Sequence, residues 1–328
     1  MNNIEKRLAT LKPTEEPDAL LEFDFVDTGY GKNHIRLLYI KRDGPTHYIK
    51  ELEVNTRLTL DSKKDYLVGD NSDIVATDSQ KNTVYILAKQ HGVKSPEEFG
   101  LLLTSHFLSK YPRVMKAKVC IEELPWERMC SDGKPHNHAF ICTPKSTRFS
   151  SVTFQRGALP EIESGLKGLR VIKTTQSAFE HFIRDEFATL PDLHERIFST
   201  VVYAKWNYAS TQGVDYDLAW NTVRDCILDA FAGPPDVGVF SPSVQNTLYL
   251  AQKRVLEKIP QMSHIETALP NKHYTAIDFS SFNSMSKNIP NDEVFLPTEH
   301  PAGNIRAVLG RKNLLPQFFP VTPMQSKL

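Results

Sequence analysis

Alternating apolar and polar residues dominate the first part of the chain and predict antiparallel strands. Residues 51–60 place Leu52, Val54, Leu58 and Leu60 on one face and polar side chains on the other. Residues 34–41 alternate in the same way. Because Arg42-Asp43-Gly44-Pro45 supplies turn residues between the two stretches, they are predicted to form a β-hairpin.

Helical spacing takes over after this hairpin. One helix is predicted at residues 79–91, ending at Gly92, a residue without the steric penalty of a Cβ atom at a helix C-terminus. A second helix follows, with Ser95 as N-cap, Pro96 in the first helical position and Glu98 closing a capping box. Strands return at residues 114–122, 136–142 and 149–155, so the first half has the order ββααββ.

The second half repeats this order. Strands are predicted at residues 169–174 and 197–208, helices at 216–231 and 241–259, and strands at 265–269, 273–279 and 305–309. The second helix begins Ser-Pro, as the one at Ser95 does. The pattern predicts an α+β fold of two tandem units, each an antiparallel sheet backed by a helix pair. The predicted divisions are an extension at residues 1–24, units at 25–160 and 161–310, and an arm at 311–328.

Charge and composition narrow the classes of partner. Among 328 residues, Lys plus Arg and Asp plus Glu each total 39, so no net field favours nucleic acid or a membrane surface. No apolar run approaches the roughly 20 residues that span a bilayer, and no secretory signal is seen, which predicts a soluble protein. Cys120, Cys130, Cys142 and Cys226 lack CxxC spacing and are expected to be free thiols.

The last residues, Ser326, Lys327 and Leu328, match the SKL address that the peroxisomal import receptor reads at a C-terminus. We therefore expect a peroxisomal protein. Peroxisomes house oxidases that release hydrogen peroxide, which makes an oxidase an attractive hypothesis.

The predicted start of the first helix is a candidate site. Thr77, Asp78 and Ser79 follow a β-branched strand end, and each can cap the free backbone N–H groups of a helix start. The ordinary interpretation is an N-cap. The alternative is a donor site for an anion or a polar ring.

Other side chains with useful chemistry are scattered along the chain. Lys32 follows a glycine and would serve as a base if buried, and His273 with Asn271 would manage a water or oxygen species. Arg196 and Gln245 suit a flat ring with C=O and N–H edges, and Phe179, at a predicted helix start, would stack on it. Taken singly, each has a structural interpretation as a surface or core residue.

A rival site consists of His136, His138 and Cys142, which alternation places on one face of a strand. These are zinc-ligand types, although a fourth ligand must come from elsewhere. No phosphate loop, nucleophile elbow or dinucleotide fingerprint is present.

Several stretches together resemble the urate oxidase (uricase) family, of the animal type, from about residue 25 to 309. The matching stretches are TGYGK (28–32), VATDSQKNTVYILAKQ (75–90), FGLLLTSHFL (99–108), GKPHNHAF (133–140), KTTQSAFEHFIRDEFATLP (173–191), SPSVQNTLY (241–249), LPNKHY (269–274) and SKL. The resemblance implies two tunnelling-fold units per chain, assembled as a homotetrameric barrel with active sites between subunits.

The same resemblance implies an activity and residue roles. Urate, O2 and water would become 5-hydroxyisourate and hydrogen peroxide without a metal or organic cofactor. Lys32 and Thr77 would form the base and proton relay, assisted by His273. Arg196 and Gln245 would clamp urate, Phe179 would stack on it, and the Asp78 and Val244 amides would bind its edge, while Asn271 and Thr77 hold O2 or water. A metal-dependent purine or pterin enzyme of the same fold is the alternative.

Overall fold

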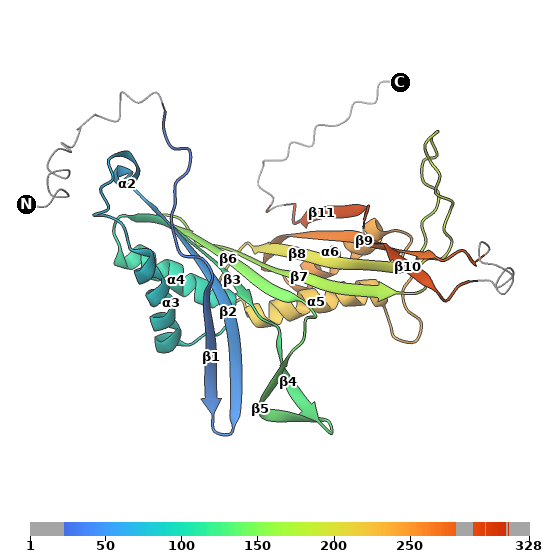
Figure 1. Cartoon of the computed structure of the whole chain (residues 1–328), viewed down its shortest axis with the longest axis horizontal. Helices are drawn as coiled ribbons and strands as arrows, with labels where there is room; N and C mark the ends of the chain where they lie inside the picture. The colour runs from blue at the N-terminus through green and yellow to red at the C-terminus, as the bar shows by residue number, and fades with distance from the viewer. Residues whose placement is uncertain (1–22, 280–290, 299, 313, 315–328) are drawn as a thin grey trace, which may run out of the picture.

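The computed structural model describes residues 23–279, 291–298, 300–312 and 314, and it is built around one twisted antiparallel sheet (Figure 1). The strand order is β1-β2-β3-β6-β7-β8-β9-β10, with β11 also paired to β9. The strands are β1 (Ile35–Asp43), β2 (Thr46–Leu60), β3 (Val114–Glu123), β6 (Thr147–Gln155), β7 (Glu161–Lys173), β8 (Phe198–Tyr208), β9 (Met262–Ala276), β10 (Phe295–Thr298) and β11 (Asn304–Gly310).

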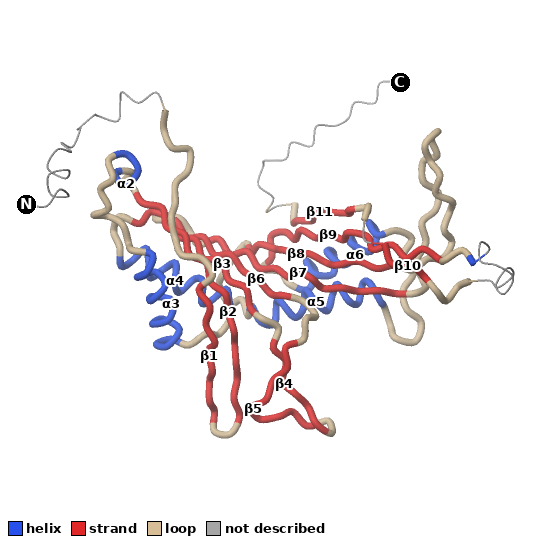
Figure 2. The backbone as a smooth tube through the Cα atoms, viewed as in Figure 1, coloured by secondary structure: helices blue, strands red, loops and turns tan. Residues whose placement is uncertain are grey.

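Two helix pairs cover one face of this sheet (Figure 2). The pairs are α3 (Thr77–His91) with α4 (Pro96–Lys110), and α5 (Tyr216–Ala232) with α6 (Val244–Lys258); a short α2 spans Lys64–Leu67. Strand register shows that the covered face is continuous. Buried Val119 on β3 lies opposite Val152 on β6, and Val152 lies opposite Ile162 on β7. Ser164, which is on the same face of β7 as Ile162, lies opposite Trp206 on β8. The alternation of side chains therefore produces a single two-layer α+β molecule.

Each helix pair has its own apolar core. In the first half, Leu103 and Phe107 of α4 pack with Val119 of β3. In the second half, Val255 of α6 and Val223 of α5 pack around Trp206 of β8. The opposite face of the sheet carries charged side chains, including the ion pair of Lys205 with Glu163 and that of Arg306 with Glu266.

Most predicted elements are confirmed, and the end signals explain why. The hairpin turns at Gly44 and Pro45, since Asp43 pairs with Thr46. Helix α3 ends at Gly92, where φ is 74°, and Ser95 caps α4 by accepting a hydrogen bond from the Glu98 amide at 3.1 Å. The four cysteines are free thiols, as predicted.

Several local predictions were wrong. Helix α6 is capped by Ser243, because the backbone of Ser241 pairs with Ser177 in a β-bridge and is not available to start a helix. Phe179 lies in a loop bridged to Leu193, not at a helix start. Residues 262–276 form one strand instead of two. The strands β10 and β4 (Trp126–Ser131), the latter paired with β5 (Lys134–Cys142), were not predicted.

The predicted N-terminal extension, apart from residues 23 and 24, and the SKL address lie outside the described residues. Within the described chain, no helix is long and apolar enough to cross a membrane.

Candidate functional site

Lys32 is held by its backbone just before β1. Its N–H donates to Thr56 Oγ1 at 3.2 Å, and its carbonyl accepts from the Thr56 amide at 2.9 Å. The preceding Gly31 makes this close approach possible, because a Cβ atom there would lie 1.7 Å from the Thr56 carbonyl oxygen. The prediction that a glycine lets the backbone approach something closely is confirmed, and its partner is β2.

A series of buried hydrogen bonds connects the backbone of Lys32 with the start of α3. Thr56 Oγ1 donates to Gln80 Oε1 at 2.7 Å, and Gln80 Nε2 donates to the carbonyl of Val75 at 3.1 Å. The hydroxyl of Tyr30 accepts from the Val75 amide at 2.8 Å. Since Gln80 is 0% and Thr56 2% exposed, these bonds fix the two segments relative to one another.

The start of α3 has no side-chain cap. Ala76 occupies the N-cap position with no side-chain hydrogen bond, so the prediction that Thr77, Asp78 or Ser79 caps the helix was wrong. The Asp78 carboxylate instead bonds Lys81 at 2.6 Å and Asn82 at 3.0 Å. The N–H groups of the first turn therefore remain available as donors beside a half-buried Thr77.

Asp78 and Lys32 interact electrostatically at this helix start. The hydrogen bond from Lys81 is the main reason that the pKa of Asp78 lies below its ordinary value, and the positive charge of Lys32 contributes in the same direction. The structure thus brings Lys32, Thr77 and Asp78 into one neighbourhood, which we call the Lys32 half-site. Its residues come from the segment before β1 and from the start of α3.

A second group gathers around Arg196, ahead of β8. The Arg196 amide donates to the carbonyl of Ser177 at 2.9 Å, and its Nε donates to Ser177 Oγ at 3.3 Å. Its guanidinium carbon lies 5.6 Å from the centroid of the Phe179 ring. Burial lowers the pKa of Arg196, which nevertheless remains a permanent cation. One face of Phe179 is stacked on Phe182, with centroids 4.9 Å apart.

The start of α6 joins this second group. Ser241 pairs with the Phe179 segment, since its carbonyl accepts from the Ala178 amide at 3.0 Å. Val244 is the first helical residue and is buried, whereas Gln245 is exposed. The Val244 amide and the Gln245 side chain therefore lie on a segment fixed to the one that carries Phe179.

Asn271 and His273 lie on β9 at the same end of the sheet. Asn271 is opposite Thr200 of β8, and its amide donates to the carbonyl of Gly303 at 2.8 Å. His273 is exposed and is opposite Thr298 of β10. We call Phe179, Arg196, Val244, Gln245, Asn271 and His273 together the Arg196 half-site.

The two half-sites lie at opposite ends of the long axis of the molecule. Figure 1 places α3 at one end and β10, with the loop between β7 and β8, at the other. Within one chain the predicted residues therefore form two separate groups. They meet only if a second copy brings its Arg196 half-site to the Lys32 half-site.

The rival metal set is not assembled. In the described part of the chain, no three His, Cys, Asp or Glu side chains are grouped as metal ligands would be. His136 Nδ1 accepts from the backbone amides of His138 and Ala139, at 3.2 and 3.0 Å. This nitrogen is engaged by the backbone of its own strand and is not free to bind a metal.

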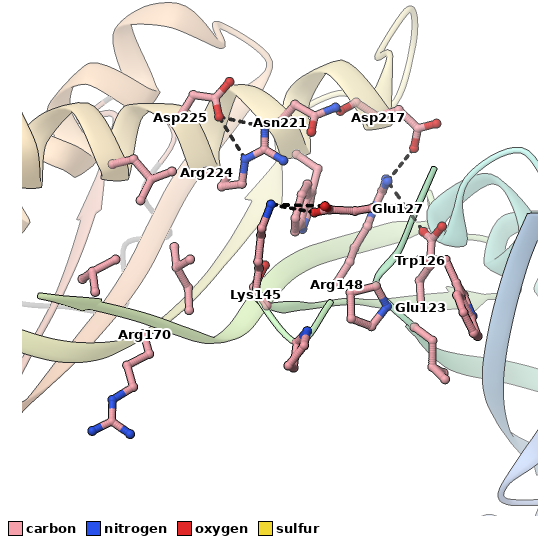
Figure 3. Close-up of a pocket in the computed structure, with 18 of the residues that line it drawn as sticks. Glu123, Trp126, Glu127, Lys145, Arg148, Arg170, Asp217, Asn221, Arg224 and Asp225 are labelled. Carbon is pink, nitrogen blue, oxygen red and sulfur yellow. Dashed lines mark hydrogen bonds and ion pairs between the residues drawn. The ribbon is translucent and has the colours of Figure 1, made fainter. Parts of the chain in front are cut away.

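A cavity of about 970 Å³ opens between β4, β6, β7 and α5 (Figure 3). Its walls carry ion pairs, such as Lys145 with Glu127 and Arg148 with Asp217. Arg148 also binds the fully buried Glu97 at 2.6 Å. None of the half-site residues lines this cavity. The ion pairs that Arg148 makes with Glu97 of α4 and Asp217 of α5 link the two helix pairs.

Comparison with known proteins decides the family. A family model described as Uricase matches residues 28–153 and 162–306. The chain belongs to the uricase family. It is 47% identical to the uricase of Drosophila melanogaster, over 89% of this chain and 90% of that protein. It is 48% identical to the uricase of Oryctolagus cuniculus, over 93% and 98%.

Solved structures agree with this assignment. The uricase from Arthrobacter globiformis is similar with a TM-score of 0.80 at 33% identity, covering 89% of this chain and 96% of that chain. The resemblance seen in the motifs and the predicted α+β fold are confirmed. No comparison supports the metal-dependent alternative.

Sequence reasoning missed Tyr30, Thr56 and Gln80, the residues that hold the Lys32 half-site together. The sequence pattern could have revealed Thr56, because it is a polar residue on the apolar face between Val54 and Leu58. It could also have revealed Gln80, a polar residue four positions before buried Val84 and so on the buried face of α3. A polar residue in an apolar stripe needs a buried partner, and here each residue is the partner of the other.

Proposed function

We propose that this chain is a urate oxidase that converts urate, O2 and water into 5-hydroxyisourate and hydrogen peroxide. Membership of the uricase family is the observation that carries this proposal. The reaction balances without a further oxidant, because O2 takes two electrons from urate and leaves as peroxide, while water supplies the new hydroxyl group. A purine anion that is rich in electrons reduces O2 itself, so no metal or organic cofactor is required.

In this proposal the Lys32 half-site handles protons. Lys32 and Thr77 form the base and relay, and the Asp78 amide meets an edge of urate at the start of α3. The geometry supports these roles because the uncapped helix start offers donors where negative charge develops. Thr77 also shares with Asn271 the task of holding O2 and later water above the ring.

The Arg196 half-site binds the substrate. Arg196 and Gln245 clamp the polar edges of urate, the Val244 amide adds a donor, and Phe179 stacks on the ring. His273 assists the proton relay. Phe182 already covers one face of Phe179, so the ring of urate is expected on the other face.

The proposed assembly is a homotetramer with each active site shared between subunits. The separation of the half-sites supports this assembly (Figure 1). Apolar side chains on the loop after Phe179 support it as well, since Ile183 is 90% and Phe187 81% exposed in the single chain. We also propose peroxisomal import through Ser326, Lys327 and Leu328, which match the SKL address.

One assay tests the proposed function. Purified full-length protein, prepared without added metal, should consume urate and release one peroxide for each urate, equally with and without a chelator. Folded tetramer that leaves urate unchanged would refute the proposal. Activity lost on chelation and restored by zinc would favour the metal-dependent alternative instead.

A further inference from the structure

Lys173, the last residue of β7, has an unusual environment. Its Nζ donates to the carbonyl of Val239 at 2.8 Å and to Ser241 Oγ at 2.7 Å. The same nitrogen lies 5.9 Å from the centroid of Phe198 and 5.5 Å from that of Phe231. Within the described residues no carboxylate pairs with it, so the ammonium binds only neutral acceptors and ring faces.

Ser241, the acceptor of Lys173, connects the parts of the Arg196 half-site. Its amide donates to the carbonyl of Gln176 at 2.8 Å, and its carbonyl accepts from Ala178 at 3.0 Å, on the segment that leads into Phe179. Thr247 Oγ1, in the first turns of α6, donates to Ser241 Oγ at 2.8 Å. Ser241 is 1% exposed, so this junction is closed to solvent.

We propose that Lys173 is a positioning residue that holds the start of α6 against the Phe179 segment and so fixes the geometry of the urate clamp. It acts through Ser241 and Val239, on either side of exposed Phe240, and touches none of the groups assigned to urate. This inference rests on the proposed function, because the clamp is defined by that function. Lys173 lies in one of the matching motif stretches, at residues 173–191, and none of the predicted roles includes it.

The energetic cost of this lysine supports a functional role. Burial lowers the pKa of Lys173 to about 8, since the charged form is partly desolvated without a carboxylate to compensate. Arg196 faces the same Phe198 ring, at 5.8 Å, so two cations share one aromatic ring. A methionine between Phe198 and Phe231 would pack without these costs. Residues that lower stability in this way are expected where function requires them.

The test compares K173M with K253M in the full-length tetramer. Lys253 is the matched control, since it lies on α6 with its side chain 52% exposed and, among the described residues, forms an ion pair only with Glu257. Xanthine, a purine dione that lacks the 8-oxo group, serves as the binding probe. K173M should raise both the Kd for xanthine and the KM for urate about tenfold, the loss expected for a hydrogen bond from a charged group. The kcat should change less than about twofold, because uniform binding is lost.

Two further variants separate positioning from general damage. The arginine of K173R can donate to both the Val239 carbonyl and Ser241 Oγ, so this variant should recover xanthine affinity to within about threefold of wild type. S241A should weaken xanthine binding in the same direction. The loss in K173M/S241A should be smaller than the sum of the two single losses, because both changes remove the bond between Lys173 and Ser241, while K173M also removes the bond to Val239 and S241A the bond from Thr247. If K173M fails to fold, S241A is compared with T247V, which removes the bond from Thr247 and keeps the bond from Lys173, and only a larger loss in S241A supports the role of Lys173.

The outcomes are distinguishable from failure of the proposed function. Wild-type protein that oxidises urate while K173M and S241A bind xanthine with wild-type affinity would overturn the positioning role alone. Equal losses in K173M and K253M would also overturn it, because the effect would then follow from removing any lysine. Wild-type protein without urate turnover would refute the proposed function first.

Discussion

Lys32 is fixed in place by its main chain, and its side chain is left free for chemistry. Both backbone groups of Lys32 bond Thr56, while its amino group makes no ion pair with a described residue. Arg196 is also anchored by its main chain, since its amide donates to Ser177, and its guanidinium is held by Ser177 Oγ and faces Phe179. A rigid backbone preorganises each of these side chains for a substrate.

Replacing the proposed relay should impair chemistry and spare binding. We expect K32A and T77A each to lower kcat about a hundredfold, as for the loss of a general base or its proton path. The Kd for xanthine should stay near the wild-type value, because no proton is transferred when an unreactive purine binds. Steady-state kinetics and calorimetry measure the two quantities, and unchanged turnover in either variant would contradict the relay.

Lys173 should also leave a signature in stability. Its folded-state pKa is about 8, whereas an unfolded lysine titrates near 10.4. Between these values the unfolded chain binds more protons, so stability rises with pH across this window and is constant below it. Thermal midpoints measured from about pH 7 to 10.5 should show this rise in wild type and K253M. The rise should be smaller in K173M, and an identical rise in all three proteins would assign it to other groups.

At the scale of elements, the two helices of the first pair begin differently. Helix α4 has the Ser95 cap with a hydrogen bond to Glu98, and α3 has Ala76 and no cap. The φ and ψ of Ala76, −48° and 139°, already suit an N-cap residue. The missing cap therefore reflects the side chain at position 76 and leaves the Asp78 amide free for a ligand.

A side-chain cap at position 76 should stabilise the fold and weaken the binding of a purine at the start of α3. We expect A76S to stabilise the fold by about 1 kcal/mol, because its hydroxyl accepts from the second or third helical amide. The same bond competes with substrate for the Asp78 amide, so xanthine affinity should fall several-fold. S95A is the control, because it removes a real cap; it should lose about 1 kcal/mol without changing affinity. Higher affinity in A76S would contradict a ligand at this helix start.

The same Ser-Pro pair starts one helix and not the other. At Ser95 the serine caps α4, as its sequence predicts. At Ser241 the backbone is paired with Ser177 and the side chain with Lys173, so α6 begins only after Ser243. Local capping signals compete with tertiary pairing, and the sequence signal does not reveal which of the two prevails.

For the whole molecule, the division of the site into two halves predicts complementation. K32A damages one half-site and R196A the other, so each variant alone should have little activity. A refolded equal mixture should regain about a quarter of wild-type activity. A shared site is intact only if its Lys32 half-site comes from an R196A subunit and its Arg196 half-site from a K32A subunit, and each of these has a chance of about one half in random assembly. Activity of the mixture is measured against each variant refolded alone. No recovery in well-formed tetramers would mean that both half-sites act within one chain.

The sequence by itself determined the elements and the family. Side-chain periods of two and near 3.6 predicted the hairpin, the helix pairs and the α+β class, since burial of one face of each element requires those periods. Motif stretches identified the uricase family and proposed residues from Lys32 to His273. Their roles and the unit boundaries remain predictions.

Only the tertiary structure decided how these pieces come together. It brought Gln80 to Thr56, Ser241 to Lys173, and the six residues of the Arg196 half-site to one end of the sheet. It also started α3 at Thr77, with Ala76 in the N-cap position, and put Phe179 in a loop. Contacts between residues distant in the chain depend on strand pairing and core packing, which no local pattern encodes. The sequence therefore specifies the elements, and packing between them places the candidate site.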